Sequence, residues 1–316
     1  MSVACAEEPQ VARAALRAAA MGVGDGDGGV VGVADAASIR PAVALRPTRS
    51  RRGSARCNPI REPASGRTLR HLFGGLLSRV CTWSASPNGL LAEVKRVLVF
   101  DVNETLLDLS ALDPHFQRVF GDAQVRLEWF QTMLQSAFLT TITGPYKAFG
   151  EHFRAALAMT ALRRDLRVSP DDERAILAGV RTLPAYPDVR PALERLRSAG
   201  FRLAALTNST AAVEEAQLQN AKLSDLFEKA LSADSGKRLK PASEAYANAA
   251  RELEVVPAEI RMVAAHVWDV QGALRAGCAA AFVERPGAVW NPLLERPDIV
   301  GPDLGEIAER VIEVDR

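Results

Sequence analysis

Residues 97–106 read Val-Leu-Val-Phe-Asp-Val-Asn-Glu-Thr-Leu, and this stretch decides the fold. Its first four residues form a short apolar run that ends on Asp101, which is typical of a strand buried inside a parallel sheet. From there to about residue 182 the apolar residues recur at helical spacing. An insertion of about 70 residues is longer than a connecting loop, so we interpret it as a helical cap that follows the first strand.

After Pro184 the chain alternates between strand-like and helix-like segments. The predicted strands are 202–206, 229–232, 261–265 and 279–283, and the predicted helices are 189–199, a segment ending near 220, 242–253 and 269–276. Such alternation forms βαβ units, which build a parallel sheet. We therefore expect an α/β protein with a Rossmann-like core made of residues 95–111 and 185–316, and a helical cap at 112–184.

The first 94 residues differ from the rest in composition. The net charge of +1 hides a split, because residues 1–94 carry 12 Arg, no Lys and 7 acidic residues, whereas residues 95–316 carry 27 basic and 31 acidic residues. The segment is rich in Gly and Arg and keeps no helical or strand period, which predicts a disordered basic extension. A transit peptide, a basic arm for nucleic acid and an upstream extension from a misplaced start codon stay as alternatives.

The four cysteines have no paired spacing, so we expect neither a disulfide framework nor a zinc site. No run of 18 apolar residues is present, which argues against a membrane-spanning helix. The near-zero net charge gives no reason to expect nucleic acid or anionic lipid as a partner. These features together predict a reduced, cytoplasmic protein that binds neither nucleic acid nor a membrane.

Polar residues follow the predicted strands at the points where those strands end. Asp101 follows the first strand, Thr207 and Asn208 follow the second, Lys240 lies in the loop after the third, and Asp269 follows the fourth. In open α/β sheets, ligands bind outside the carboxyl ends of the strands. The sequence therefore predicts that these residues form one functional site at one edge of the sheet.

Four segments of the chain resemble the motifs of the haloacid dehalogenase superfamily, in the same order and spacing. They are Asp101-Val102-Asn103-Glu104-Thr105-Leu106, Leu206-Thr207-Asn208-Ser209, Lys240-Pro241 and Trp268-Asp269. Within that superfamily the chain is most similar to the type II 2-haloacid dehalogenases, over about residues 95–316. The resemblance implies a hydrolase that converts short 2-haloacids, or similar small carboxylic acids, to 2-hydroxy acids.

The resemblance also implies roles for the catalytic residues. Asp101 would attack the substrate carbon and form an ester, which water then hydrolyses. Lys240 would keep Asp101 ionised through its opposite charge, and Thr105 would orient Asp101. Thr207 would hydrogen-bond the substrate carboxylate. Asp269 would position or deprotonate the water that cleaves the ester.

Other residues match the family's substrate pocket. Asn208 would hydrogen-bond the substrate carboxylate together with Thr207, and Tyr246 and Trp268 match pocket residues. Related dehalogenases are often dimers, so a homodimer is a further expectation, although no interface is evident in the sequence.

Two features separate dehalogenase from phosphatase chemistry. Phosphatases of the superfamily carry Asp two residues after the nucleophile, as a general acid, but this chain carries Asn103, which cannot donate and recover a proton in that way. The fourth motif offers one carboxylate, Asp269, where phosphatases generally offer two, whereas magnesium needs several hard oxygen ligands. We therefore expect catalysis without a metal or another cofactor. A magnesium phosphatase is the first alternative.

The chain also departs from the dehalogenase pattern. Those enzymes have an Arg in the first cap helix that helps receive the halide, and here Phe130 stands in that place, with Arg126 one turn earlier as a possible substitute. Ala264 and His266 stand where dehalogenases have Ser and Asn. His266 could shuttle a proton near neutral pH or make a structural hydrogen bond. These departures keep open a second alternative, a catalytically repurposed binding protein.

Overall fold

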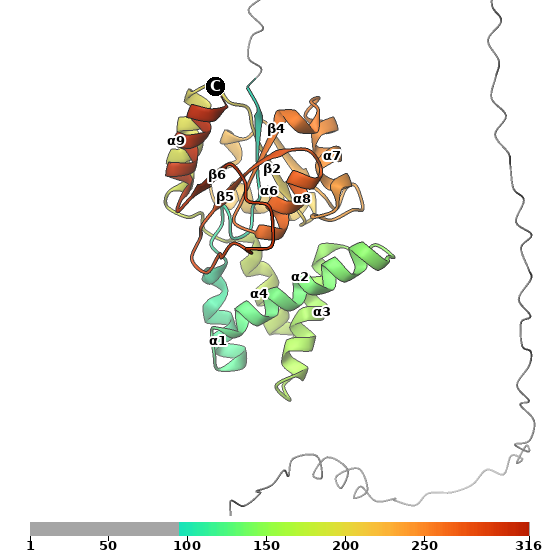
Figure 1. Cartoon of the computed structure of the whole chain (residues 1–316). Helices are drawn as coiled ribbons and strands as arrows, with labels where there is room; N and C mark the ends of the chain where they lie inside the picture. Colours follow the sequence, from blue (N-terminus) through green and yellow to red (C-terminus); the bar gives the residue numbers. More distant parts are fainter. Residues whose placement is uncertain (1–94, 316) are drawn as a thin grey trace, which may run out of the picture. The chain divides into compact units, whose positions relative to one another are not determined.

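The computed structural model describes residues 95–315, and the predicted disordered extension, residues 1–94, lies outside the described residues. The described chain builds a six-stranded sheet in the order β3-β2-β1-β4-β5-β6 (Figure 1). Every neighbouring pair of strands is parallel. The prediction of an α/β fold with a parallel, Rossmann-like sheet is therefore confirmed.

The strands are short and lie along the second half of the chain, apart from the first. They are β1 (Val97–Phe100), β2 (Leu203–Thr207), β3 (Lys229–Ser232), β4 (Ile260–Ala264), β5 (Ala279–Val283) and β6 (Ile299–Gly301). The helices are α1 (Asp113–Phe120), α2 (Val125–Thr143), α3 (Phe149–Leu162), α4 (Pro170–Arg181), α5 (Val189–Ser198), α6 (Ala211–Asn220), α7 (Ser243–Glu252), α8 (Val267–Arg275) and α9 (Leu304–Val314).

The sheet has one strand more than the sequence pattern predicts. The last predicted strand is 279–283, but the sheet continues with β6, which pairs with β5, and the chain then forms α9. A strand of three residues is too short to show a period-2 pattern. Its pairing depends on the packing of α9 against α5 and β6, which a local pattern does not report.

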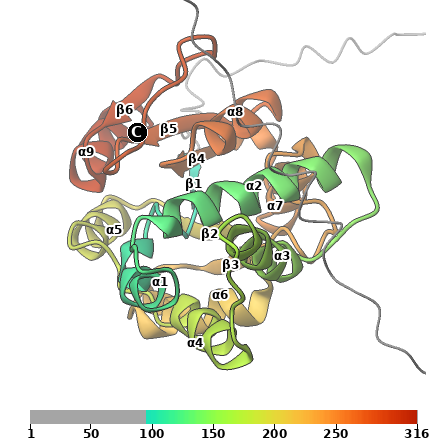
Figure 2. The same ribbon diagram turned by 90° about the horizontal axis from the view of Figure 1, so that it is seen from below.

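Both faces of the sheet are buried, because helices cover each of them (Figure 2). In β1 the side chains of Val97 and Val99 belong to the core shared with α7 and α8. The side chains of Leu98 and Phe100 belong to the opposite core, shared with α5 and α9. Successive residues of a strand point to opposite faces, so burial on both sides requires an unbroken apolar run. This explains the sequence of β1.

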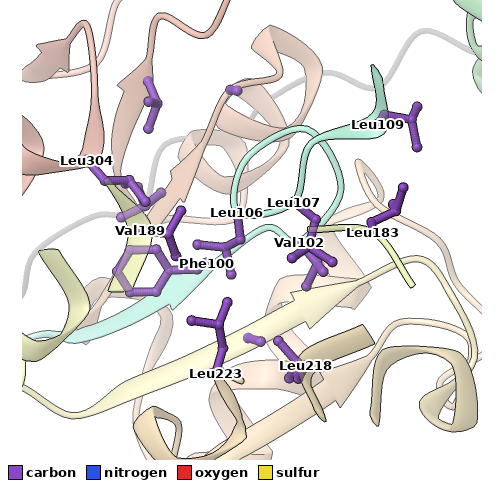
Figure 3. Close-up of a cluster of buried hydrophobic side chains, with 14 of the residues drawn as sticks. Phe100, Val102, Leu106, Leu107, Leu109, Leu183, Val189, Leu218, Leu223 and Leu304 are labelled. Carbon is purple, nitrogen blue, oxygen red and sulfur yellow. The ribbon is translucent and has the colours of Figure 1, made fainter. Parts of the chain in front are cut away.

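The side chain of Phe100 lies in the middle of the larger core, close to Val189 of α5, Leu106 and Leu223 (Figure 3). It is fully buried and meets Phe227 edge-on, with ring centroids 6.1 Å apart. We expect Phe100→Ala to lower the free energy of unfolding by about 3–5 kcal/mol, because it leaves a large cavity. Urea unfolding measures this loss. Leu139→Ala, on an exposed position of α2, serves as the control and is expected to cost under about 1 kcal/mol.

The four helices α1 to α4 lie between β1 and α5 in the chain, over the range for which the sequence predicts a cap. Figure 1 shows them grouped at the end of the sheet toward which β1 runs. Helix α4 begins as its sequence indicates, with the Ser169 side chain accepting from the backbone N–H of Asp172 at 3.1 Å and Pro170 in the first turn. Because the cap lies at this end, its side chains can reach the carboxyl ends of the strands.

Candidate active site

The polar residues that end the strands meet at one edge of the sheet. Asp101 follows β1 directly, Thr207 is the last residue of β2 with Asn208 after it, and Asp269 lies in the first turn of α8, after β4. Lys240 comes from the loop between β3 and α7. All five are buried, although their polar or charged side chains are of types that normally face solvent. Such groups persist in a core only when they are paired.

Three side chains donate hydrogen bonds to the Asp101 carboxylate. Thr105 Oγ1 lies 2.7 Å from Oδ2, His266 Nδ1 lies 3.1 Å from Oδ2, and Lys240 Nζ lies 2.8 Å from Oδ1. Burial alone would raise the pKa of Asp101, but the charge of Lys240 and the hydrogen bond from His266 outweigh it and hold the pKa well below its usual value. Asp101 is therefore a buried, fully ionised carboxylate.

Lys240 is completely buried, and its ammonium group has three acceptors. Nζ donates to Asp101 Oδ1 at 2.8 Å, to Asp269 Oδ2 at 2.6 Å and to the carbonyl of Leu206 at 2.7 Å. Burial would lower the pKa of Lys240, but the two carboxylates raise it above its usual value. An ammonium group has three N–H donors, so all of them are used and the side chain is held in one orientation.

Asp269 lies behind Lys240 and not on the cavity surface. Its Oδ2 accepts from Lys240, and its Oδ1 accepts from the hydroxyl of Tyr246 at 2.6 Å. Neither Asp269 nor Tyr246 lines the cavity over Asp101, and both are buried. Tyr246 therefore holds Asp269 in place, and its role as a pocket residue stays a prediction. Both oxygens of Asp269 bond other side chains, and its role in positioning or deprotonating the water stays a prediction. Gly272 allows this packing, because a Cβ there would lie 2.5 Å from the Tyr246 hydroxyl.

His266 bridges two carboxylates. Its Nδ1 faces Asp101, and its Nε2 lies 3.1 Å from Glu104 Oε2. Burial would lower the pKa of His266, but the hydrogen bonds to these carboxylates raise it to about 9, so the ring is protonated at neutral pH. The guanidinium group of Arg126, the possible substitute for the cap arginine, contacts Glu104 at 3.6 Å and Asp113. His266 is therefore a second cation beside Asp101, in addition to Lys240.

Two aromatic rings flank the imidazole of His266. The ring of Trp268 is stacked on it with centroids 5.1 Å apart, and the ring of Phe130, from α2, lies at 5.8 Å. Phe130 and His266 are both departures from the dehalogenase pattern, and the structure places them in contact. Phe130 of the cap thus stands where the dehalogenase pattern has an arginine. The positive charge at this place comes instead from His266 of the core.

A small cavity of about 20 Å³ lies over Asp101, enough for about one water molecule. Its walls combine the strand-end residues with side chains of the cap helices. They are Asp101, Asn103, Phe130, Leu134, Phe149, Thr207, Asn208, Lys240, His266 and Trp268. Of the predicted site residues, Thr105, Asp269 and Tyr246 lie outside this wall. Leu134 and Phe149 were missed, because an apolar residue of a cap helix has the same pattern whether it faces a cavity or a core.

A second cavity, of about 290 Å³, shares Asn103, Phe130 and Phe149 with the first. It opens between the cap helices α2, α3 and α4 and the loop that precedes α6, where Ser209 and Thr210 lie. The volume is close to that of a small-molecule pocket. The two cavities adjoin at the three residues that they share.

The amide side chains near the cavity are mostly held by other residues. Asn208 accepts from the backbone N–H of Lys240 at 2.8 Å and donates to its carbonyl at 3.1 Å, so its side chain positions the lysine. Asn103 accepts from Gln217 Nε2 at 2.9 Å. The hydroxyl oxygen of Thr207 accepts from the backbone N–H of Ser209 at 3.1 Å, which leaves the hydroxyl proton free for a substrate oxygen. Of these residues, Thr207 has the side chain best placed to bind a carboxylate.

Glu104 and Gln217 are site residues that sequence reasoning missed. Glu104 lies inside the first motif, but its backbone has a φ of 61°, an unusual value for glutamate, and nothing in the sequence indicates that its side chain turns toward His266.

No helix within residues 95–315 combines the length and apolar character needed to cross a bilayer.

Comparisons with known proteins agree on one group. The family model of the haloacid dehalogenase-like hydrolases matches residues 95–277. The chain is 30% identical over 214 residues to (S)-2-haloacid dehalogenase 2 of Pseudomonas sp. (strain CBS-3), covering 67% of this chain and 93% of the relative. It is 28% identical over 216 residues to haloacetate dehalogenase H-2 of Moraxella sp. (strain B), covering 68% and 96%.

Solved structures give the same result. An L-2-haloacid dehalogenase from Xanthobacter autotrophicus, with chloropropionic acid covalently bound, superposes with a TM-score of 0.65 at 26% identity. The match covers 70% of this chain and 99% of that enzyme.

Proposed function

The chain belongs to the haloacid dehalogenase-like hydrolases, and we propose that it cleaves the carbon–halogen bond of short 2-haloacids to give 2-hydroxy acids. The observation that carries this proposal is the ionised Asp101, buried and held by Thr105, Lys240 and His266 at the wall of a cavity. A carboxylate so placed, with its charge fixed and its water excluded, suits attack on carbon.

In the proposed first step, Asp101 attacks the carbon that bears the halogen. A bond forms between a carboxylate oxygen and that carbon, and the halide leaves with the bonding electrons, so an ester on Asp101 results. Thr207 binds the substrate carboxylate through its free hydroxyl proton and so orients the carbon. A halide leaves without protonation, which fits the presence of Asn103 in place of an acid.

In the proposed second step, water hydrolyses the ester and restores Asp101. Lys240 and Asp269 form the ion pair next to the ester, with 2.6 Å between Nζ and Oδ2. Asp269 then acts through Lys240, since its own oxygens do not reach the cavity. The relatives named dehalogenases support this chemistry for the chain, since they are similar to it in sequence and in fold.

The alternative of a magnesium phosphatase has less support from this site. The ammonium group of Lys240 lies between Asp101 and Asp269 and bonds both, while His266 occupies the other oxygen of Asp101. Magnesium would meet these donors and not the several oxygen ligands that it requires. Among residues 95–315, no three His, Cys, Asp or Glu side chains form a group suited to a metal ion.

The homodimer and the cytoplasmic location stay predictions.

Halide release tests the proposed function. We expect the purified chain to release bromide from 2-bromopropionate or bromoacetate in buffer with EDTA, at a rate that added magnesium leaves unchanged. Ion chromatography measures the halide, and p-nitrophenyl phosphate with magnesium serves as the phosphatase control. Phosphate release from that ester together with no halide from a panel of short 2-haloacids would contradict the proposal.

A further inference from the structure

The three donors around Asp101 divide its two oxygens unequally. Oδ2 accepts from both Thr105 and His266, at 2.7 and 3.1 Å, whereas Oδ1 accepts only from Lys240, at 2.8 Å. A carboxylate oxygen offers about two lone-pair sites, so among the described residues Oδ2 is saturated and Oδ1 keeps one site free. Oδ1 is therefore the oxygen available to attack a substrate carbon. Oδ2 then becomes the carbonyl oxygen of the ester.

We propose that His266 is a catalytic residue of ester hydrolysis, where its Nδ1–H stabilises the negative charge that develops on Asp101 Oδ2. This inference rests on the proposed function and concerns its second step. It assigns His266 a role different from both of those considered from the sequence, proton shuttling and structural hydrogen bonding.

Water attacks Cγ of the Asp101 ester, and the electron pair of the carbonyl bond moves to Oδ2. The bond between Cγ and Oδ1 then breaks, and Lys240 gives a proton to Oδ1 of the departing 2-hydroxy acid. The first proton of the water passes to the pair formed by Lys240 and Asp269, which restores the ammonium group. Asp101 is left as a carboxylic acid and releases its proton to solvent as it ionises again.

The donors to Oδ2 are already in place before this charge develops. Thr105 is fully buried, and its Oγ1 accepts from the backbone N–H of Ala265 at 2.9 Å, so its single proton is directed to Oδ2. His266 is held between the rings of Phe130 and Trp268. Donors that are fixed in advance stabilise a developing oxyanion without the cost of reorganising water.

Glu104 is the positioning residue for His266. When Asp101 becomes an ester it loses its charge, and Glu104, 3.1 Å from Nε2, is the carboxylate that still keeps the ring protonated. Glu104 is itself held by Arg126, at 3.6 Å. The other titratable or charged groups around His266 are Lys240, beyond Asp101, and Arg285 and Tyr186, which line the same cavity as the imidazole ring.

The experiment separates the two steps by rapid quench with 2-bromopropionate. Halide reports ester formation, and the mass of the Asp101 peptide reports the ester itself. For His266→Ala we expect a halide burst near one per active site, a steady-state rate about 10²–10³-fold lower, and accumulated ester. His266→Asn keeps a neutral donor and should recover part of the rate. His115→Asn, on α1 and outside the cavity walls, is the matched control and should behave as wild type.

Glu104→Gln provides a second variant with a different readout. Losing this charge should move the alkaline limb of ester hydrolysis to lower pH, by about one to three units, since His266 then loses its proton more easily. A merely structural Glu104 would lower the rate at every pH without moving that limb.

The outcomes distinguish this inference from the function on which it rests. A His266→Ala enzyme that stalls before halide release, or that turns over at the wild-type rate, overturns the role of His266 alone. An unshifted pH limb in Glu104→Gln overturns the role of Glu104. Wild-type enzyme that releases no halide and forms no ester overturns the proposed function together with this inference.

Discussion

Replacing Asp101 by asparagine should abolish halide release, with a loss of at least about 10⁴-fold in kcat. The amide has nearly the shape of the carboxylate, but it has no negative charge with which to attack carbon. The wild-type carboxylate has this charge throughout the working pH range, because Lys240 and His266 hold its pKa well below the usual value. Halide measured by ion chromatography over hours reports the residual rate.

The matched control for this variant is Asp171→Asn. Asp171 lies in the first turn of α4 with its side chain 84% exposed, so the same chemical change there should leave the rate unchanged. Circular dichroism of both variants verifies that they fold. An Asp101→Asn enzyme that folds and still releases halide at more than about one hundredth of the wild-type rate would show that Asp101 is not the nucleophile.

Replacing Lys240 by methionine should have the second-largest effect, on both activity and stability. The variant removes the ammonium group that bonds both Asp101 and Asp269 and leaves two buried carboxylates facing one another. Removing one partner of a buried ion pair lowers the free energy of unfolding by about 3–5 kcal/mol. Because like charges raise each other's pKa, the pair will hold a proton and Asp101 will be a weaker nucleophile. We expect kcat to fall by about 10³-fold or more at neutral pH.

The pH dependence of stability gives this prediction a distinctive sign. In wild type, Asp101 has a pKa below that of the unfolded chain, so its stabilising contribution is present above the unfolded pKa and is lost as the pH falls toward the folded one. In Lys240→Met the pKa of the carboxylate pair is raised above that of the unfolded chain. The folded state then binds a proton more tightly than the unfolded chain does, so this pair stabilises the fold as the pH falls. Between pH 8 and pH 5 the raised pKa of His266 already makes wild type gain stability as the pH falls, so the melting temperature of the variant should rise more steeply than that of wild type, which thermal unfolding measures.

Lys229→Met is the matched control for this experiment. Lys229 is exposed at the start of β3, and β3 runs parallel to β1, so it lies at the edge of the sheet opposite the site. Its replacement should change neither the rate nor the slope of melting temperature against pH. A Lys240→Met enzyme whose melting temperature changes with pH as that of wild type does would contradict the placement of Lys240 between the two carboxylates.

The order of elements was readable from the sequence because it depends on neighbours along the chain. The apolar run of β1 is unbroken since both faces are covered, and the N-cap at Ser169 is formed by residues within one turn. The short strand β6 was not readable, because three residues carry no period and their pairing with β5 depends on distant packing. Motif residues at strand ends converge for a topological reason, which is why Asp101, Thr207 and Lys240 were predictable.

The sequence by itself therefore determined the α/β fold and the meeting of Asp101 with Lys240 at the strand ends, since strand ends and short motifs are local properties of the chain. Only the tertiary structure decided how the site is connected. It placed Asp269 behind Lys240, turned Glu104 toward His266, and brought Phe130 from the cap against that imidazole. Asp101 and His266 are far apart in the chain, so their side chains meet only when β1, α2 and α8 pack together.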